Sequence, residues 1–430
     1  MHKTLPAPEA ANPTRRFETR IRRRARPGAA ASLAAALLLT SCGHAAPADP
    51  GAAETAPAAS PAQQEASTAT PRLVMTYDGG IMTADATNLE VIAEEPLAGF
   101  NRLNPAGDGR HVLVSTGDAF QVYDGGAWSS RHGDHAHHYT AQPGLTSTKF
   151  TAPEPGHAVN HAGMTALFSD GTGRIEVFDP ADLAEGKPEV KEHLLEHAHH
   201  GVAVPLEDGG LLVTLGTADS RNGIAVLDAA GKEVARNEDC PGTHGEAATD
   251  GAVVVGCEDG ILIYRDGKIT KVDSPDSYGR MGNQAGTEHS TVVLGDYKVD
   301  QDAELERPER ISLIDTATAQ LQLVDLGTSY SFRSLGRGPH GEALVLGTDG
   351  ALHKIDPESG TITRRIPVVE EWSEPLEWQQ PRPTLFVQDH TAYVTDPAEQ
   401  NLHAVDLETG EVTTTAELPH VPNEITGISG

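Results

Sequence analysis

The sequence lacks several features that point to common classes of protein. It has no surplus of basic residues: the formal net charge is −30, and such a surface repels nucleic acid and anionic lipid headgroups. No apolar run is long enough for a comfortable membrane span. There is no nucleophile elbow, no Ser-His-Asp arrangement in a known order and no phosphate-binding glycine loop. We therefore expect a protein that is not an enzyme and does not bind nucleic acid.

Cysteine is also scarce, with three residues in a chain of 430. Cys42 lies in Leu39-Thr40-Ser41-Cys42-Gly43, which resembles a bacterial lipobox. Cys240 and Cys257 remain as a pair in an exported, oxidising context, where a disulfide is the default. Because the loop is short, the bridge would contribute roughly 3 kcal/mol of stability. The alternative is a Cys/His metal site that includes His244.

Residues 1–41 have the pattern of an export signal. Seven arginines between Arg15 and Arg26 precede an apolar segment, Ala29 to Thr40. Cleavage before Cys42 would leave a lipid-bearing N-terminus, so we expect an extracytoplasmic protein that is lipid-anchored to the cell membrane.

Residues 42–71 are rich in Ala, Pro, Ser and Thr, have few large apolar residues, and are expected to form a flexible tether. The signal holds eight basic and two acidic residues, so the remaining chain has a net charge near −36. Such a surface attracts cations and basic partners.

Residues 72–430 contain an internal repeat of about 45 residues, a length typical of propeller blades. Short apolar runs alternate with turns that contain Gly and Asp, as in Met164–Phe168 and Arg174–Asp179. Strands this short, with turns this regular, predict an all-β fold. We expect an eight-bladed β-propeller, with seven blades as the alternative.

The two ends of this domain complement each other. The first repeat unit, residues 73–94, lacks its innermost strand, and residues 422–429 form a spare strand after the eighth unit. If the spare strand completes the first blade, both termini join in one blade and the ring closes, which removes exposed sheet edges.

Four histidines and one aspartate lie within the nine residues from Arg131 to Tyr139. Neutral imidazole is a good ligand for zinc, copper and nickel, and a nearby carboxylate adds charge and an oxygen ligand. Such His-rich tracts are a compositional signal for metal binding. Alternation along an extended chain places His135 and His137 on one face. The candidate ligands are His132, His135, His137 and His138.

Further histidines occupy equivalent positions in three successive repeat units. Each directly precedes the expected innermost strand, so in a propeller they would converge near the mouth of the central channel. The candidates are His157, then His199 or His200, and His244, with Glu246 on the same strand face as His244. They predict a four-ligand zinc site in which Glu246 is the best candidate for the carboxylate. Such a site should weaken below about pH 6.5, because imidazole binds metal only when neutral.

The position of the His-rich tract has two alternatives, because the outer strand after Phe120–Asp124 is ambiguous. If Ala127–Ser130 is the outer strand, the tract lies on the same face as the convergent histidines. If Leu145–Thr151 is the outer strand, it lies on the opposite face. The turn at Gly125-Gly126 resembles that at Asp266-Gly267, which favours the first alternative.

The remaining histidines fall into two groups. One group is expected at turns on the opposite face, in structural or capping roles: His161, His289, His340 and His390. The other lies within apolar strands and is expected to pack between blades: His111, His353 and His403.

Together, the lipobox, the repeats, the tract from His132 to Tyr139, His199-His200-Gly201 and the segment from Cys240 to Glu246 resemble the AztD family of bacterial zinc metallochaperones. The resemblance covers most of residues 72–430, and the His-rich tract is its most specific part. It implies extracytoplasmic zinc binding, a mobile His-rich loop and a disulfide-compatible cysteine pair. It also implies delivery of zinc to the solute-binding protein of a zinc ABC transporter. A lipoprotein form departs from soluble periplasmic members of the family. We expect a monomer whose only membrane contact is its lipid anchor.

Two other functions compete with this interpretation. A propeller enzyme, such as a zinc-dependent hydrolase or a lactonase-like protein, would need an open metal site and a general base, for which Glu246 is a candidate. A propeller that only binds proteins would carry its histidines incidentally. Metal titration separates the three functions, because an enzyme binds about one metal tightly, a chaperone has exchangeable sites and a scaffold binds none.

Overall fold

The computed structural model describes residues 63–430 except Asp134. The export signal, the lipobox with Cys42 and most of the expected tether lie outside these residues. The regular secondary structure of the described chain is almost entirely β, with strands β1 to β35 and a short 3-10 helix, η1 (Pro180–Glu185). Within the described residues, no helix has the length and apolar character needed to span a membrane.

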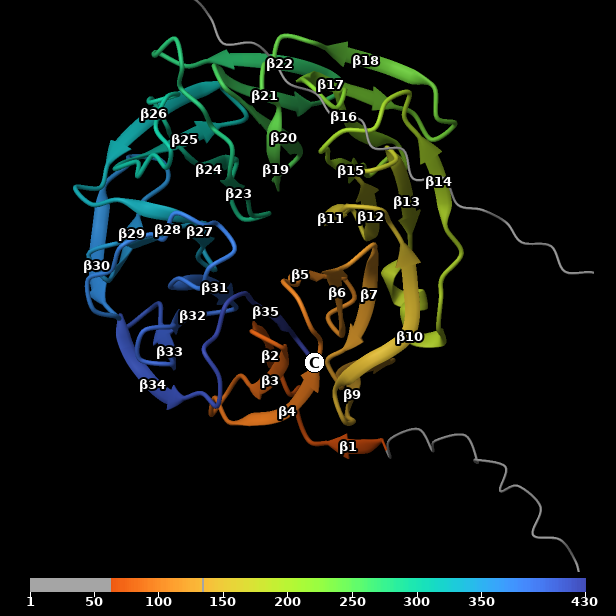
Figure 1. Ribbon diagram of the computed structural model, residues 1–430, viewed down its shortest axis with the longest axis vertical. Coiled ribbons are helices and arrows are strands. Elements are labelled where there is room, and N and C mark those ends of the chain that lie inside the picture. The colour runs from red at the N-terminus through yellow and green to blue at the C-terminus, as the bar shows by residue number, and fades with distance from the viewer. Residues whose placement is uncertain (1–62, 134) are drawn as a thin grey trace, which may run out of the picture. The chain divides into compact units, whose positions relative to one another are not determined.

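In residues 63–430, apart from Asp134, eight four-stranded antiparallel sheets succeed one another around a common centre (Figure 1). The first sheet, from its innermost strand outward, consists of β35 (Ile425–Ile428), β2 (Arg72–Tyr77), β3 (Gly80–Asp85) and β4 (Val91–Pro96). The second consists of β5 (Arg102–Pro105), β6 (His111–Thr116), β7 (Ala119–Asp124) and β10 (Gly144–Thr151). The third consists of β11 (Pro155–His161), β12 (Met164–Ser169), β13 (Arg174–Phe178) and β14 (Lys191–Leu194), and the fourth of β15 (Ala203–Pro205), β16 (Leu211–Gly216), β17 (Arg221–Leu227) and β18 (Glu233–Asn237). The other four are β19 (His244–Thr249), β20 (Ala252–Cys257), β21 (Gly260–Arg265) and β22 (Lys268–Asp273); β23 (Gln284–Ala285), β24 (Val292–Asp296), β25 (Arg310–Asp315) and β26 (Gln320–Asp325); β27 (Tyr330–Arg337), β28 (Ala343–Gly347), β29 (Ala351–Ile355) and β30 (Ile362–Pro367); and β31 (Thr384–Gln388), β32 (Thr391–Asp396), β33 (Asn401–Asp406) and β34 (Glu411–Glu417).

The core lies between neighbouring sheets, because both faces of each sheet are apolar. In β12, Leu167 packs toward the β5–β10 sheet, whereas its neighbours Ala166 and Phe168 pack toward the β15–β18 sheet. Side chains alternate along a strand, so one continuous apolar run supplies two interfaces. This alternation explains why the central strands read as unbroken apolar runs in the sequence.

The C-terminal strand β35 lies in the same sheet as β2, β3 and β4, with Ile428 opposite Arg72 and Ile425 opposite Met75. It therefore occupies the innermost position that the first repeat unit lacks. This sheet packs on the β31–β34 sheet through Leu73 and on the β5–β10 sheet through Val74.

The antiparallel strands define two faces of this arrangement. An innermost strand begins on one face, and because directions alternate, the third strand of the same sheet ends on the other face. We call the face on which innermost strands begin the cluster face, because His157, His200 and His244 lie there. The opposite face is called the hairpin face.

The His-rich tract forms a hairpin of β8 (Ala127–His132) and β9 (His135–Thr140). It is inserted after β7, the third strand of its sheet, and therefore lies on the hairpin face. The outer strand is β10, which pairs with β7, so the preference for Ala127–Ser130 was wrong. The reason is packing: Phe150 of β10 is fully buried between sheets, whereas β8 beyond Ala127 carries only partly buried or exposed side chains.

The strand β1 (Gln64–Ala66) pairs with β9 and completes a three-stranded sheet with the hairpin (Figure 1). These residues fall within the segment 42–71 that composition assigned to the tether. The last part of the expected tether, Gln64–Ala66, therefore pairs directly with the His-rich hairpin.

Candidate metal centre

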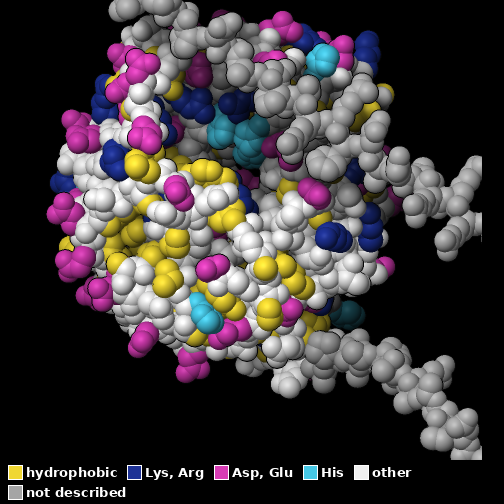
Figure 2. All heavy atoms as spheres, in the orientation of Figure 1, with side chains coloured by type: hydrophobic (Ala, Val, Ile, Leu, Met, Phe, Trp, Pro, Cys, Tyr) yellow, Lys and Arg dark blue, Asp and Glu magenta, His cyan; other side chains and the backbone are white. Residues whose placement is uncertain are grey.

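Three histidines from three successive sheets meet on the cluster face. His157 lies in β11, His200 precedes β15 and His244 begins β19. One ring nitrogen of each lies within 4.8 Å of the other two. The Nε2 atoms of His200 and His244 are 3.3 Å apart. Figure 2 shows histidine side chains in a hollow of this region, with Lys and Arg side chains beside them.

In two of the three rings, the other nitrogen contacts an acceptor that fixes the orientation of the ring. The Nδ1 of His200 is 2.6 Å from Oδ2 of Asp170, and the Nδ1 of His244 is 2.7 Å from the carbonyl oxygen of Gly282. The Nδ1 of His157 lies 3.5 Å from Oε2 of Glu246. Acceptors of this kind set the tautomer and aim of metal-binding imidazoles.

Glycines make the close approach of these acceptors possible. A Cβ at Gly156 would lie 2.1 Å from Oδ1 of Asp170. Gly245 has a φ of +73° and interrupts the β19–β20 register between His244 and Glu246. A Cβ there would lie 2.6 Å from the Gly282 oxygen that His244 contacts. Side chains at these two positions would therefore displace the groups that orient the cluster.

Burial sets the protonation of the site. It lowers the pKa of His157 well below its usual value and that of His244 to about 3, and the nearby guanidinium of Arg221 acts in the same direction on both. Burial also raises the pKa of Glu246 to about 8. At neutral pH, His157 and His244 are therefore neutral, as metal binding requires, and the Glu246 carboxyl holds a proton.

His199 is not part of this cluster. Its ring is 4% exposed and packs on Phe168, and its nitrogens contact the His197 carbonyl and Thr214 Oγ1. Of the two adjacent histidines, the structure thus brings His200 to the cluster. Asp170 was not identified from sequence, because nothing in its spacing relates it to a histidine 30 residues further on.

The expected disulfide between Cys240 and Cys257 is confirmed. Both residues are buried in the core between the β15–β18 and β19–β22 sheets. The Cys240 carbonyl also accepts a 2.6 Å hydrogen bond from Thr243 Oγ1, which fixes the chain immediately before His244. The alternative Cys/His metal site is wrong, because both sulfurs are bonded to each other.

The hairpin divides its histidines between two sides. His132 is the cross-strand partner of His135, and the Nε2 atoms of His135 and His137 are 3.2 Å apart, which confirms that these two share a face. The Nδ1 of His137 is 2.9 Å from Oε1 of Glu65, a residue that sequence reasoning assigned to the tether. His138 instead contacts Ser129 Oγ at 2.7 Å.

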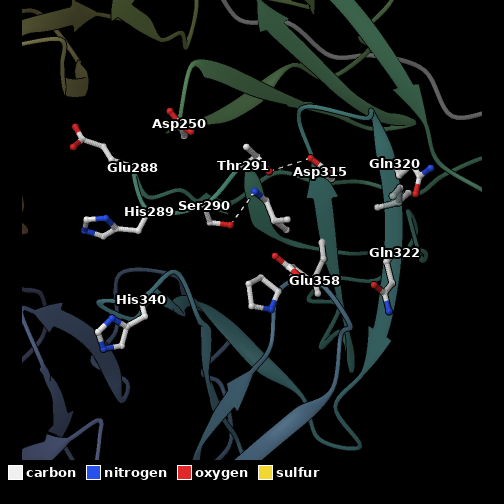
Figure 3. Close-up of a pocket in the computed structure, with 14 residues that line it drawn as sticks. Asp250, Glu288, His289, Ser290, Thr291, Asp315, Gln320, Gln322, His340 and Glu358 are labelled. Atoms are coloured by element: carbon white, nitrogen blue, oxygen red, sulfur yellow. Dashed lines mark hydrogen bonds between the residues drawn. The ribbon is translucent and has the colours of Figure 1, made fainter.

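The remaining histidines follow the expected division. Those expected at turns on the hairpin face lie there, and Figure 3 shows His289 and His340 on successive turns beside one pocket. His161 is the last residue of β11, next to such a turn, with its Nδ1 2.6 Å from the carbonyl oxygen of Pro205. The strand histidines His111, His353 and His403 are buried, which confirms their packing role.

Comparison with known proteins gives consistent relatives. No family model matches this chain. The zinc chaperone AztD of Citrobacter koseri is 27% identical over 362 residues, which are 80% of this chain and 83% of that protein.

Solved structures agree with this relative. The crystal structure of Citrobacter koseri AztD has a TM-score of 0.72 at 25% identity, covering 84% of this chain and 99% of that one. The structure of apo AztD from the same organism has a TM-score of 0.71 at 24% identity, over 84% and 98% of the two chains. The dihydro-heme d1 dehydrogenase NirN, at 14% identity and a TM-score of 0.51, shares the fold alone. The resemblance to AztD is thus confirmed.

Proposed function

We propose that this protein is an extracytoplasmic zinc chaperone that carries zinc as cargo to the solute-binding protein of a zinc ABC transporter. Similarity to the zinc chaperone AztD over four fifths of the chain supports the class of function. The cluster of His157, His200 and His244 supports the metal. We assign no catalytic role to the site.

One observation carries the proposal: the facing nitrogens of His200 and His244. A carbonyl oxygen can only accept a hydrogen bond, so the Nδ1 of His244 must be protonated and donate to the Gly282 carbonyl. In this neutral tautomer, Nε2 of His244 carries a lone pair. The Asp170 carboxylate imposes the same tautomer on His200. Two lone pairs 3.3 Å apart repel each other unless a proton or a metal ion lies between them.

We propose that ligand exchange occurs at the fourth coordination position of the zinc ion. Glu246 lies beside His157 and can complete a tetrahedral site once it loses its proton. A donor group from the solute-binding protein can take the same position instead. Zinc then passes from one set of ligands to the other without release into solution.

The hairpin supplies a second, weaker set of zinc ligands in this proposal. His132, His135 and His137 share one side, with Glu65 beside them, whereas His138 is directed to the other side. Since the hairpin and the cluster lie on opposite faces, we propose separate roles for them, without direct ligand exchange between the two sets in one chain.

We further propose that the eight sheets are the blades of a closed eight-bladed propeller. Eight apolar clusters of the described residues each join two neighbouring sheets, and one of them joins the last sheet to the first through Leu402 and Leu73. The pairing of β35 with β2 places both ends of the domain in one blade. In a closed propeller, only the short outer edge of each blade would stay exposed.

For the N-terminal region we propose an export signal over residues 1–41, a lipid on Cys42 and a tether that ends before β1. The support is the sequence pattern from Leu39 to Gly43. The change Cys42→Ala should release the protein from the membrane fraction and alter its processing. A variant that stays in the membrane fraction with unchanged processing would contradict the lipid anchor.

The central experiment is zinc titration of the metal-free chain followed by transfer. We expect a tight site in competition with a chromophoric chelator. We also expect passage of zinc to the solute-binding protein at a rate that depends on the acceptor concentration. A transfer rate fixed by spontaneous zinc dissociation would contradict direct delivery. Tightly held, non-exchangeable zinc with hydrolytic activity would favour the enzyme alternative.

A further inference from the structure

We propose a second metal site on the hairpin face, formed by His340, His390 and Glu408. One donor atom from each of these residues lies within 4.8 Å of the other two. Two imidazoles and a carboxylate form a ligand set that suits zinc and related divalent transition metals. The site is separate from the cluster and the hairpin and does not depend on the proposed transfer function.

The three residues come from turns of two neighbouring sheets. His340 lies between β27 and β28, His390 between β31 and β32, and Glu408 between β33 and β34. All three turns are on the hairpin face, because each follows the first or third strand of its sheet. The site therefore exists only when the two sheets pack against each other, which hides it from any search for a local sequence motif.

Distances within the set suit a metal ion. The Nδ1 of His390 is 3.3 Å from Oε1 of Glu408. Metal–ligand bonds of about 2.1 Å at tetrahedral angles place neighbouring donor atoms roughly 3.4 Å apart. The ring centroids of His340 and His390 are 5.6 Å apart at 64°. Figure 3 shows His340 and Asp315 on opposite sides of the neighbouring pocket, with the His340 ring directed away from Asp315.

The backbone of these turns is braced by hydrogen bonds. The His390 carbonyl accepts from Leu407 N at 3.0 Å, which links two of the turns. Asp406 Oδ1 accepts from Glu408 N at 2.9 Å, and Glu342 Oε2 accepts from His340 N at 3.0 Å. A metal would therefore need to order only the side chains. Because all three residues are exposed, coordination positions stay open to water, and the bound metal should exchange readily.

The simpler alternative is a surface ion pair of His390 with Glu408, and the chain supplies a matched control for it. His420 pairs with Glu94 at 3.1 Å, with a side chain 39% exposed against 55% for His390, and it belongs to no group of three donors among the described residues. An ion pair without metal would make His390 and His420 equivalent in metal binding, whereas the proposed site would not.

The test uses the full chain with His244→Ala, His135→Ala and His137→Ala, which weaken the other two sets of ligands. Zinc titration of this background should show one remaining site per chain. His390→Ala should lower the zinc affinity of this site by at least about tenfold. Loss of a group that only hydrogen-bonds to a metal ligand already costs about that much, and His390 is a proposed ligand. Glu408→Gln should also weaken the site, and His420→Ala should leave it unchanged.

Two results would overturn the site: a background that binds no zinc, or equal binding by the His390→Ala and His420→Ala variants. Histidine side-chain NMR spectra of the background should also show His340 and His390 shifting together as zinc is added. Failure of the cluster to bind zinc in the otherwise unsubstituted chain would affect the proposed function but leave this result unchanged.

Discussion

The cluster and the hairpin use the same kind of side chain in opposite environments. At the cluster, His157 and Glu246 have side chains that are 24% and 19% exposed, and acceptors from other parts of the chain orient His200 and His244. At the hairpin, His137 is 40% exposed and its carboxylate neighbour Glu65 is 64% exposed. His157 and His244 are thus desolvated, whereas the His200 side chain is 43% exposed but is held by Asp170. The hairpin set is solvated and supported by one short sheet.

Because of this difference in environment, histidine ligands in one chain can bind metal with two different affinities. Burial removes competition from protons at His157 and His244 by lowering their pKa, and fixed acceptors reduce the ordering that binding requires. At the hairpin, the acceptor beside His137 is Glu65, whose own side chain is 64% exposed, so it holds the ring less firmly. We therefore expect tight binding at the cluster and weak binding at the hairpin, and the comparison can be tested from both sides.

Removing a ligand from the buried set should have the largest effect. His244→Ala removes an imidazole that contributes one of three converging nitrogens, so tight zinc binding should weaken by more than about 100-fold, beyond the range for outer-sphere partners. Chelator competition measures this loss. Unchanged tight binding in this variant would remove the distinction between the two regions.

Removing an orienting group should have the next largest effect. Asp170→Asn keeps the size of the side chain but weakens the hold on His200, so zinc affinity should fall by about 10–100-fold. Asp219→Asn is the control, because Asp219 lines the pocket beside His200 and His244, and no hydrogen bond or ion pair of the described residues joins it to the three rings. Equal affinities for the two variants would show that Asp170 does not orient the site.

The buried carboxyl should give the cluster a pH dependence. With its pKa raised to about 8, Glu246 holds a proton below that pH, and zinc must displace this proton if the carboxylate is a ligand. Affinity should then rise by up to about tenfold per pH unit from about pH 6 to pH 8 and level off above.

Titrations in matched buffers measure this slope. Because the pKa values of His157 and His244 are lowered, protons do not compete with zinc for these residues in that range. The sequence alone predicts weaker zinc binding below about pH 6.5, the usual pKa of histidine. Glu246→Gln should flatten the dependence. A slope that persists in this variant would assign the titration to another group.

Changes at the exposed set should have the smallest effect. His135→Ala with His137→Ala should lower the number of zinc ions bound and leave the tight site within about twofold, because the two regions share no ligand. His138→Ala is the control on the other side of the hairpin. Loss of tight binding in the double variant would show that the hairpin and the cluster act together.

Much of the fold was predictable because it depends on local patterns. Apolar runs such as Ala252–Cys257 and Arg310–Asp315 coincide with strands β20 and β25. The signals that predict a strand, namely the hydrophobic pattern, the length of the run and the turn residues beside it, all lie within one repeat unit. The position of the hairpin was not predictable in the same way. Both candidate outer strands were adequate by themselves, and only the burial of Phe150 between sheets decided between them.

By itself, the sequence determined the all-β repeat, the paired cysteines and the histidines that begin successive innermost strands, because each is set by residues close together in the chain. Only the tertiary structure selected His200 over His199, brought Asp170 and the Gly282 carbonyl to the rings, and placed Glu65 beside His137. The physical reason is that orientation and protonation come from acceptors on other blades and from burial. Neither follows from the spacing of residues along the chain.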